Sequence, residues 1–241
     1  MVEARTSSTE AVAGVIGGMG PEATVELMRR VIAVTPARDD ADHIHLLVDN
    51  NPKVPSRIKA LIEGTGEDPA PTLIDMARRL ESAGADFLVI PCNTAHYYWQ
   101  QIRQAVDVPV WNIIELTLRR AATSVGTPMS VGMLASPALR RVRLYEAHCA
   151  AYGASLIYPE DEETLLALIR AVKAGRFGDA ELAQLNSAAS RLIDAGADVL
   201  VLGCTEFSLV AERLAVTAPV IDSLQVLCEE IVAHVKGSTP G

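Results

Sequence analysis

Short apolar runs rich in β-branched residues alternate along the chain with longer segments that repeat their apolar positions every three to four residues. The short runs predict buried strands over 12–16, 44–48, 87–90, 130–134, 155–158 and 199–202. The longer segments predict helices over 21–34, 71–83, 139–151, 164–174 and 180–195. Strands that alternate with helices are typical of parallel sheets covered by helices, so the pattern predicts the α/β class.

A sequence repeat divides the chain into two related halves. Residues 79–92 align without gaps with residues 191–204, and nine of the fourteen positions are identical. Further matches join 108–112 to 218–222 and 13–17 to 131–135. We therefore expect two related α/β halves, formed by 1–115 with 222–241 and by 116–221.

Each copy of the repeat ends in a cysteine, and these are the first candidate chemical groups. A shared helix–turn–strand unit explains the apolar matches, but it does not explain why Cys92 and Cys204 occupy the same position. Each thiol follows a strand, and open α/β sheets bind ligands outside the carboxyl ends of their strands. Polar residues suited to opening a helix come next, and a helix N-terminus favours thiolate, which predicts a lowered thiol pKa.

Two thiols that approach one cleft from opposite sides suit inversion at a carbon centre. One thiolate would remove a proton from one face while the other thiol delivers a proton to the opposite face. Cys149 and Cys228 lie within helical segments and have no matched partner, so we expect them to be buried without a chemical role.

Composition narrows the functional classes. The chain has 241 residues and is 49% hydrophobic, but no apolar run approaches the ~20 residues of a membrane span. The formal net charge is −9 and no basic cluster occurs, which argues against a nucleic-acid partner. The first ten residues lack the features of a secretory signal, and four widely spaced cysteines do not form a disulfide framework. We therefore expect a cytoplasmic protein.

A zinc site and a dinucleotide-binding site are two alternatives to a site built on the two thiols. The spacing of Cys92 and His96, with the pair His43 and His45, permits a zinc site, but the second half has no counterpart and we predict no metal. The glycine-rich turn over 17–23 partly fits a dinucleotide fingerprint, but the next acidic residue at a strand end lies well beyond the usual ~20 residues. We prefer a loop whose backbone N–H groups hold a substrate carboxylate.

Three motifs carry a resemblance to a known family. Residues 17–24, 91–96 and 203–206 resemble the aspartate/glutamate racemase family, and most closely its aspartate racemase branch, over about residues 12–235. The resemblance implies a cofactor-independent racemase with two pseudo-symmetric Rossmann-like or flavodoxin-like domains and an active site in the cleft between them. It also implies a small acidic amino-acid substrate and a homodimer. Glutamate racemases differ in the first loop and commonly carry histidine where this chain has Glu206.

The resemblance also implies roles for individual residues. Cys92 and Cys204 would be the catalytic acid and base, without pyridoxal phosphate. The substrate-binding set would comprise Met19, Gly20, Arg57, Asn93, Thr94, Lys173, Thr205 and Glu206. In this set Arg57 and Lys173 would hold the distal carboxylate, because a dianionic substrate in an acidic chain needs local cations. Ser56 and residues 135–138 depart from the family pattern, so aspartate, glutamate and a bulkier substrate stay open.

Other functions also remain open from the sequence. A maleate isomerase or a hydantoin racemase shares these features, whereas the second cysteine, Cys204, counts against a single-thiol decarboxylase. A non-catalytic amino-acid-binding or dinucleotide-binding protein is the alternative from a different class. Substrate-protected alkylation of the thiols would favour catalysis, and thermal stabilisation by NAD would favour dinucleotide binding.

Overall fold

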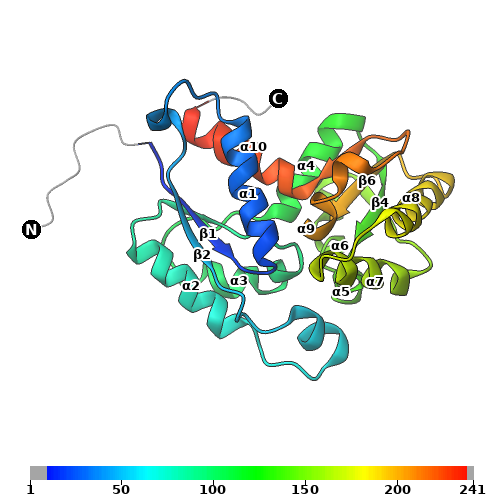
Figure 1. The fold of residues 1–241 in the computed structure, drawn as a ribbon, viewed down its shortest axis with the longest axis horizontal. Coiled ribbons are helices and arrows are strands. Elements are labelled where there is room, and N and C mark those ends of the chain that lie inside the picture. The colour runs from blue at the N-terminus through cyan, green and yellow to red at the C-terminus, as the bar shows by residue number, and fades with distance from the viewer. Residues whose placement is uncertain (1–9, 238–241) are drawn as a thin grey trace, which may run out of the picture.

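Two parallel sheets form the framework of the protein, and the first half lies beside the second (Figure 1). The computed structural model describes residues 10–237. The first sheet has the order β2-β1-β3 and the second the order β5-β4-β6-β7. Their strands are β1 (Ala13–Gly17), β2 (Leu46–Asn50), β3 (Phe87–Val89), β4 (Met129–Ala135), β5 (Ala154–Ile157), β6 (Val199–Gly203) and β7 (Val220–Asp222). The predicted α/β class with parallel sheets is confirmed.

Helices cover both sheets and join their strands. They are α1 (Pro21–Val34), α2 (Ala70–Ser82), α3 (Trp99–Arg103), α4 (Ile113–Val125), α5 (Pro137–Arg141), α6 (Glu146–Cys149), α7 (Glu162–Lys173), α8 (Asp179–Asp194), α9 (Thr205–Ser208) and α10 (Ser223–Lys236). Shorter helical turns are η1 (Asp40–Asp42), η2 (Lys59–Glu63), η3 (Thr94–Tyr98), η4 (Ala150–Tyr152) and η5 (Ala211–Arg213). No helix within residues 10–237 is both long and apolar enough to cross a membrane.

The repeated Ala-Gly-Ala-Asp turn builds the same joint in both halves. The Asp86 carboxylate accepts a hydrogen bond from the backbone N–H of Val12 at 2.7 Å, and Asp198 does the same for Ser130 at 2.7 Å. In return, the N–H of each aspartate donates to the carbonyl of that same partner at 2.8 Å. Each aspartate therefore fixes the start of the neighbouring central strand, which explains why it recurs.

Close packing explains two further repeated residues. A Cβ atom on Gly14 in β1 would lie 2.8 Å from Cβ of Ala85, and one on Gly132 in β4 would lie 3.0 Å from Cβ of Ala197. Both contacts are shorter than ordinary van der Waals distances, so only glycine fits opposite this alanine. The two halves thus repeat in packing as well as in sequence.

The helices α4 and α10 are also matched, and they lie in the shared core. Asn112 accepts a hydrogen bond from Ile114 N at 3.0 Å at the start of α4, and Asp222 accepts one from Leu224 N at 2.9 Å at the start of α10. One hydrophobic cluster contains residues of both sheets together with residues of α1, α4 and α10. The division into two domains stays a prediction.

One predicted helix is wrong. The segment over 139–151 is broken into α5, α6 and η4. The break occurs at Arg143, whose φ of 51° lies in the left-handed region and cannot continue a right-handed helix. The backbone turns there because Leu144 N donates to Leu139 O, which ends α5. The turn brings the fully buried Tyr145 into the core.

Candidate active site

A cavity of about 310 Å³ lies between the two halves and contains both matched cysteines. Cys92 enters it from the first half and Cys204 from the second, and each cysteine is only 7% exposed. The remaining lining residues are Gly18, Met19, Gly20, Pro21, Pro52, Val54, Ser56, Arg57, Ile58, Thr94, Ser136, Ile169, Lys173 and Glu206. The structure therefore brings together both predicted catalytic residues and six of the predicted substrate-binding residues.

The loop that carries Cys92 is fixed by a buried histidine. The Nδ1 atom of His96 lies 2.9 Å from the carbonyl oxygen of Cys92, and Nε2 accepts a hydrogen bond from Ile113 N at 3.1 Å. Burial lowers the pKa of His96 to about 4, so its ring is neutral and Nδ1–H is the donor to Cys92. His96 thus ties the Cys92 loop to α4.

Cys204 has a polar environment of a different kind. Its Sγ donates a hydrogen bond to Oε2 of Glu206 at 2.9 Å, and Oε1 of Glu206 forms an ion pair with Nζ of Lys173. Burial raises the pKa of the Cys204 thiol, and the adjacent Glu206 carboxylate raises it further. Burial alone would lower the pKa of Lys173, but the carboxylate of Glu206 outweighs it and the pKa is raised.

The predicted lowering of the thiol pKa by a helix N-terminus is wrong for Cys204. This residue caps α9, which has only four residues and therefore supplies little dipole. Desolvation and the neighbouring carboxylate prevail over that small effect and over the attraction of Lys173. The structure therefore favours a protonated Cys204 thiol that donates to Glu206.

The glycine-rich turn is held close to its neighbours. Gly18 has φ of 89°, and a Cβ atom there would lie 2.3 Å from the backbone of Asn51. The N–H of Gly18 donates to Oγ1 of Thr24 at 2.9 Å, which anchors the turn to α1. Met19 and Gly20 follow and line the cavity, as predicted for a loop that approaches the substrate.

Arg57 is positioned by the same loop. Its Nη2 donates to the carbonyl oxygen of Met19 at 3.1 Å, and its Nη1 donates to that of Pro55 at 3.0 Å. Its Nε–H is buried and has no hydrogen-bond partner among residues 10–237. Arg57 therefore presents a positive charge at the cavity that no carboxylate of the described chain neutralises.

Two predicted substrate-binding residues do not line the cavity. Asn93 is 2% exposed, and its amide bridges the halves by accepting from Tyr145 Oη at 2.7 Å and donating to Ser223 Oγ at 2.8 Å. Thr205 is equally buried, at 2% exposure. The structure thus places Asn93 beneath the site, where it connects the Cys92 loop with the second half.

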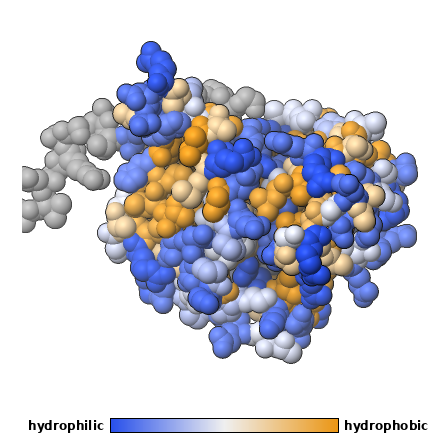
Figure 2. All heavy atoms as spheres, viewed as in Figure 1, coloured by the Kyte–Doolittle hydropathy of each residue, from blue (hydrophilic) through white to orange (hydrophobic). Residues whose placement is uncertain are grey.

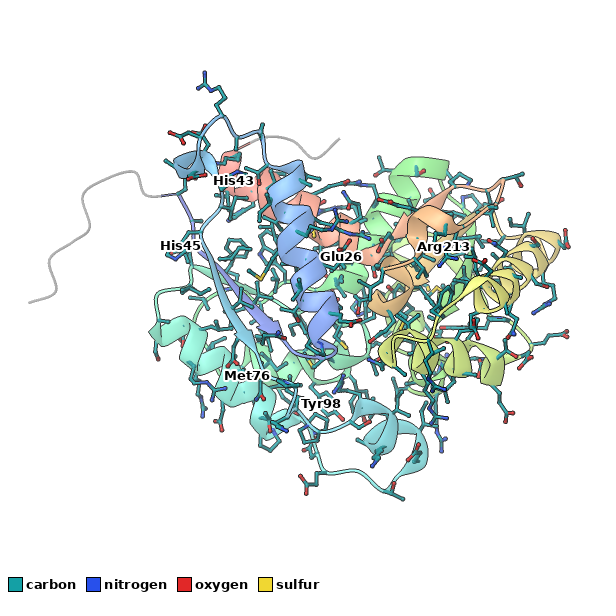
Figure 3. The ribbon with its side chains drawn as sticks, viewed as in Figure 1. Glu26, His43, His45, Met76, Tyr98 and Arg213 are labelled. Atoms are coloured by element: carbon teal, nitrogen blue, oxygen red, sulfur yellow. The ribbon has the colours of Figure 1, made fainter. Side chains whose placement is uncertain are left out.

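The other candidate groups lie elsewhere. His43 and His45 sit at one end of the molecule, away from Tyr98 at the end of η3 (Figure 3). Within residues 10–237 no group of three His, Cys, Asp or Glu side chains is arranged to hold a metal. Cys149 and Cys228 are buried free thiols outside the cavity. Burial raises the pKa of both, to about 11 for Cys149.

Comparison with known proteins decides the family. The model of the family described as Asp/Glu/Hydantoin racemase matches residues 16–231, which is most of the chain. The chain belongs to this family.

The chain resembles three racemases, two of them over more than nine tenths of its length. A broad-specificity amino-acid racemase, RacX of Bacillus subtilis, is 27% identical over 91% of this chain and 96% of its own. The structure of the Picrophilus torridus aspartate racemase superposes with a TM-score of 0.78 and 26% identity, covering 96% of each chain. A glutamate racemase from Shewanella is 28% identical over 59% of this chain and 51% of its own.

Some lining residues have no signal in the sequence. Val54, Ile58 and Ile169 form an apolar part of the cavity wall. Each of these residues lies in a segment whose sequence pattern predicts only an ordinary helix or loop. The fold then brings the three side chains beside the thiols. The sequence does not predict the ion pair of Lys173 and Glu206 either, because the two residues are 33 positions apart and lie on different helices.

Proposed function

We propose that the protein racemises an acidic amino acid, aspartate and possibly glutamate, by a two-base mechanism at Cys92 and Cys204 without pyridoxal phosphate. The observation that carries this proposal is that two matched thiols from opposite halves of the chain line one cavity. The membership of the racemase family and the likeness to an aspartate racemase support it.

In this mechanism the two thiols exchange roles with each turnover. One thiolate takes the α-proton and becomes a thiol, while the opposite thiol gives its proton to the other face of the α-carbon and becomes a thiolate. The α-proton is far less acidic than a thiol, so the barrier must be lowered by removing water and by donors fixed at the developing enediolate. The buried cysteines and the Met19–Gly20 loop, which lines the cavity, support this proposal.

The charges of the cavity favour an anionic substrate bound near Arg57. Lys173 already faces the carboxylate of Glu206, so Arg57 is the lining cation that is not internally neutralised. A carboxylate is the natural acceptor for its buried Nε–H, since an unsatisfied donor is costly. We assign Arg57 to the distal carboxylate and Thr94, with the Met19–Gly20 loop, to the α-carboxylate and amino group.

Hydrogen exchange at the α-carbon tests the function. The protein is incubated in deuterated water with L-aspartate, D-aspartate or L-glutamate, and deuterium at Cα is followed together with optical rotation. We expect deuterium to enter aspartate as the enantiomers interconvert. The absence of exchange in every amino acid tried would refute the proposal, and exchange in a hydantoin but in no amino acid would redirect it within the family.

We also propose that two copies associate through the outer face of α1. Val25, Met28 and Ile32 are 59%, 37% and 55% exposed and are spaced three and four residues apart, so they form one apolar stripe. Hydrophobic surface gathers over α1 and the neighbouring strands β1 and β2 (Figure 2). Light scattering should give a dimer mass for the wild type and a monomer mass for Ile32→Lys. A monomer mass for the wild type would refute the proposed dimer.

We place the protein in the reducing cytoplasm because the mechanism needs both thiols free.

A further inference from the structure

A chain of buried hydrogen bonds joins the two segments that carry the thiols. Asn93 directly follows Cys92, and its Nδ2 donates to Oγ of Ser223 at 2.8 Å. The Ser223 hydroxyl in turn donates to the carbonyl oxygen of Leu202 at 2.7 Å. Leu202 lies in β6, two residues before Cys204. Two side-chain hydrogen bonds therefore connect the loop of Cys92 with the strand that leads to Cys204.

This chain is closed off from solvent and from the cavity. Asn93 is buried, and Ser223 and Leu202 are buried completely. The carbonyl oxygen of the Asn93 side chain is occupied as well, because it accepts the hydrogen bond of Tyr145. Neither Asn93 nor Ser223 lines the cavity of the thiols. A buried polar network with all its members paired favours one arrangement, because any other arrangement leaves a polar group without a partner.

The framework that the two halves share does not contain this polar pair. Ser223 is the first residue of α10, and Ile113 is the first residue of the matched helix α4. The residue that follows the cysteine is Asn93 in the first half and Thr205 in the second. Ile113 packs in the hydrophobic cluster common to both sheets, so this position does not need a hydroxyl in order to pack. Burial of a hydroxyl is costly unless it is hydrogen-bonded, and Ser223 uses its hydroxyl for the link between the two thiol segments.

We propose that Asn93 and Ser223 are positioning residues, which fix the loop of Cys92 relative to Cys204 so that both thiols act on one α-carbon. This inference rests on the proposed racemase function and assigns it two residues outside the cavity. In a two-base inversion, one thiol must deliver its proton to the carbon that the opposite thiolate has just deprotonated. A misplacement of about 1 Å costs a reaction about 100-fold in rate. A broken link should therefore slow inversion and leave substrate binding nearly unchanged.

Ser223→Ala tests the link, because it removes the shared hydroxyl and leaves every lining side chain of the cavity in place. Racemisation of aspartate is measured at several concentrations, and urea denaturation reports the folded fraction. We expect kcat to fall about tenfold or more while KM stays within about twofold, as for an interaction that acts on the transition state and not on binding.

The fate of the α-proton gives a readout that does not depend on the amount of folded protein. In deuterated water, the thiolate that removes the proton becomes a thiol and exchanges this proton for deuterium. If the opposite thiol does not deliver first, the deuterium returns to the same face and the starting enantiomer is recovered. The ratio of deuterated starting enantiomer to inverted product should rise about tenfold in Ser223→Ala. A loss of folded protein alone would leave this ratio unchanged.

Thr35→Val is the matched control. Thr35 is buried at the end of α1, and its hydroxyl donates to the backbone carbonyl of Val31 at 2.5 Å, outside the cavity. The variant therefore also loses one buried hydrogen bond from a hydroxyl to a carbonyl, but it should keep the wild-type ratio and KM.

Asn93→Ala breaks the same link from its other end and should raise the ratio as Ser223→Ala does. The double variant should be no worse than the stronger single variant, because both remove one connection. A wild-type ratio in Ser223→Ala and in Asn93→Ala overturns the inference and leaves the proposed function intact. A raised KM with wild-type kcat in Asn93→Ala assigns Asn93 to substrate binding and also overturns it. A wild-type protein that exchanges no amino acid refutes the proposed function itself, and the inference with it.

Discussion

The two halves share one framework and differ around their thiols. The aspartate joints, the tight glycines and the helix caps recur in both halves. Two residues beyond each cysteine, however, the first half has Thr94 and the second has Glu206, which accepts the hydrogen bond of Cys204. The comparison teaches that the fold delivers two thiols to equivalent places, while burial and the neighbouring Glu206 carboxylate raise the pKa of Cys204.

Removal of either thiol has the largest expected effect. Cys92→Ala and Cys204→Ala should each lower racemisation by about a thousandfold, because each variant lacks the acid or the base of one face. Optical rotation measures racemisation, and deuterium exchange at Cα measures proton removal alone. The thiol that remains can still exchange the proton on its own side, so each variant should retain exchange for one enantiomer.

Cys149→Ala is the matched control, because it removes a buried thiol outside the cavity. It should racemise aspartate at close to the wild-type rate. Full racemisation by either of the two active-site variants would exclude the two-base mechanism, whatever the substrate is.

Much of the framework is predictable from the sequence because its causes are local. Buried strands produce continuous apolar runs, and all six predicted strands occur with small shifts at their ends. The position of Cys92 and Cys204 after their strands is equally predictable, since the carboxyl ends of parallel strands share one edge. The helix of 21–34 begins and ends as predicted, with Pro21 in its first turn.

The remaining features of the fold and of the candidate site depend on contacts between segments that are distant in the sequence. The break at Arg143 arises from a left-handed residue that helical periodicity does not reveal. The pKa of Cys204 depends on Glu206, whose side chain is oriented by Lys173 from another helix. None of these features has a pattern of its own along the chain.

The matched helix caps predict unequal losses of stability. Asp222 caps α10 and also accepts from Arg30 Nη1 at 2.6 Å and from Ser208 Oγ at 2.5 Å. Asn112→Ala removes a cap and should cost about 1 kcal/mol of unfolding free energy. Asp222→Ala also leaves the buried Arg30 without that partner and should cost about 3 kcal/mol or more. Urea denaturation measures both, and equal costs would contradict the unequal roles of the caps.

Acid sensitivity should come from the first half. His96 lies four residues after Cys92, and the second half has Ser208 at the matching position. The pKa of His96 is lowered to about 4, from about 6.5 in the unfolded chain, so the unfolded state binds the extra proton first as the pH falls. Stability should therefore be fully present above pH ~6.5 and decline by about 3 kcal/mol towards pH ~4.

Unfolding free energies of the wild type and His96→Gln at several pH values test this. The variant should lose stability at neutral pH and show a flatter dependence between pH ~4 and ~6.5. His45→Gln, which changes a histidine outside the site, should keep the wild-type slope. A slope unchanged in His96→Gln would assign the acid sensitivity to carboxylates instead.

The smallest expected effect separates the two thiols directly. Because burial and the Glu206 carboxylate raise the pKa of Cys204, little of this thiol is thiolate near neutral pH, and iodoacetamide should label it slowly. Glu206→Gln removes the negative charge and keeps the side-chain size. The pKa of Cys204 should then fall, and its labelling rate at pH 7 should rise about tenfold relative to Cys92.

Peptide mass spectrometry of partly alkylated protein gives both labelling rates in one sample, so that Cys92 serves as the internal reference. Glu212→Gln, on the exposed turn η5, is the control for a change in overall charge and should alter neither rate. If Glu206→Gln raises both rates equally, the variant has loosened the cavity and the carboxylate does not act on Cys204 alone. A selective rise at Cys204 means that the Glu206 carboxylate keeps this thiol protonated, as a proton donor requires.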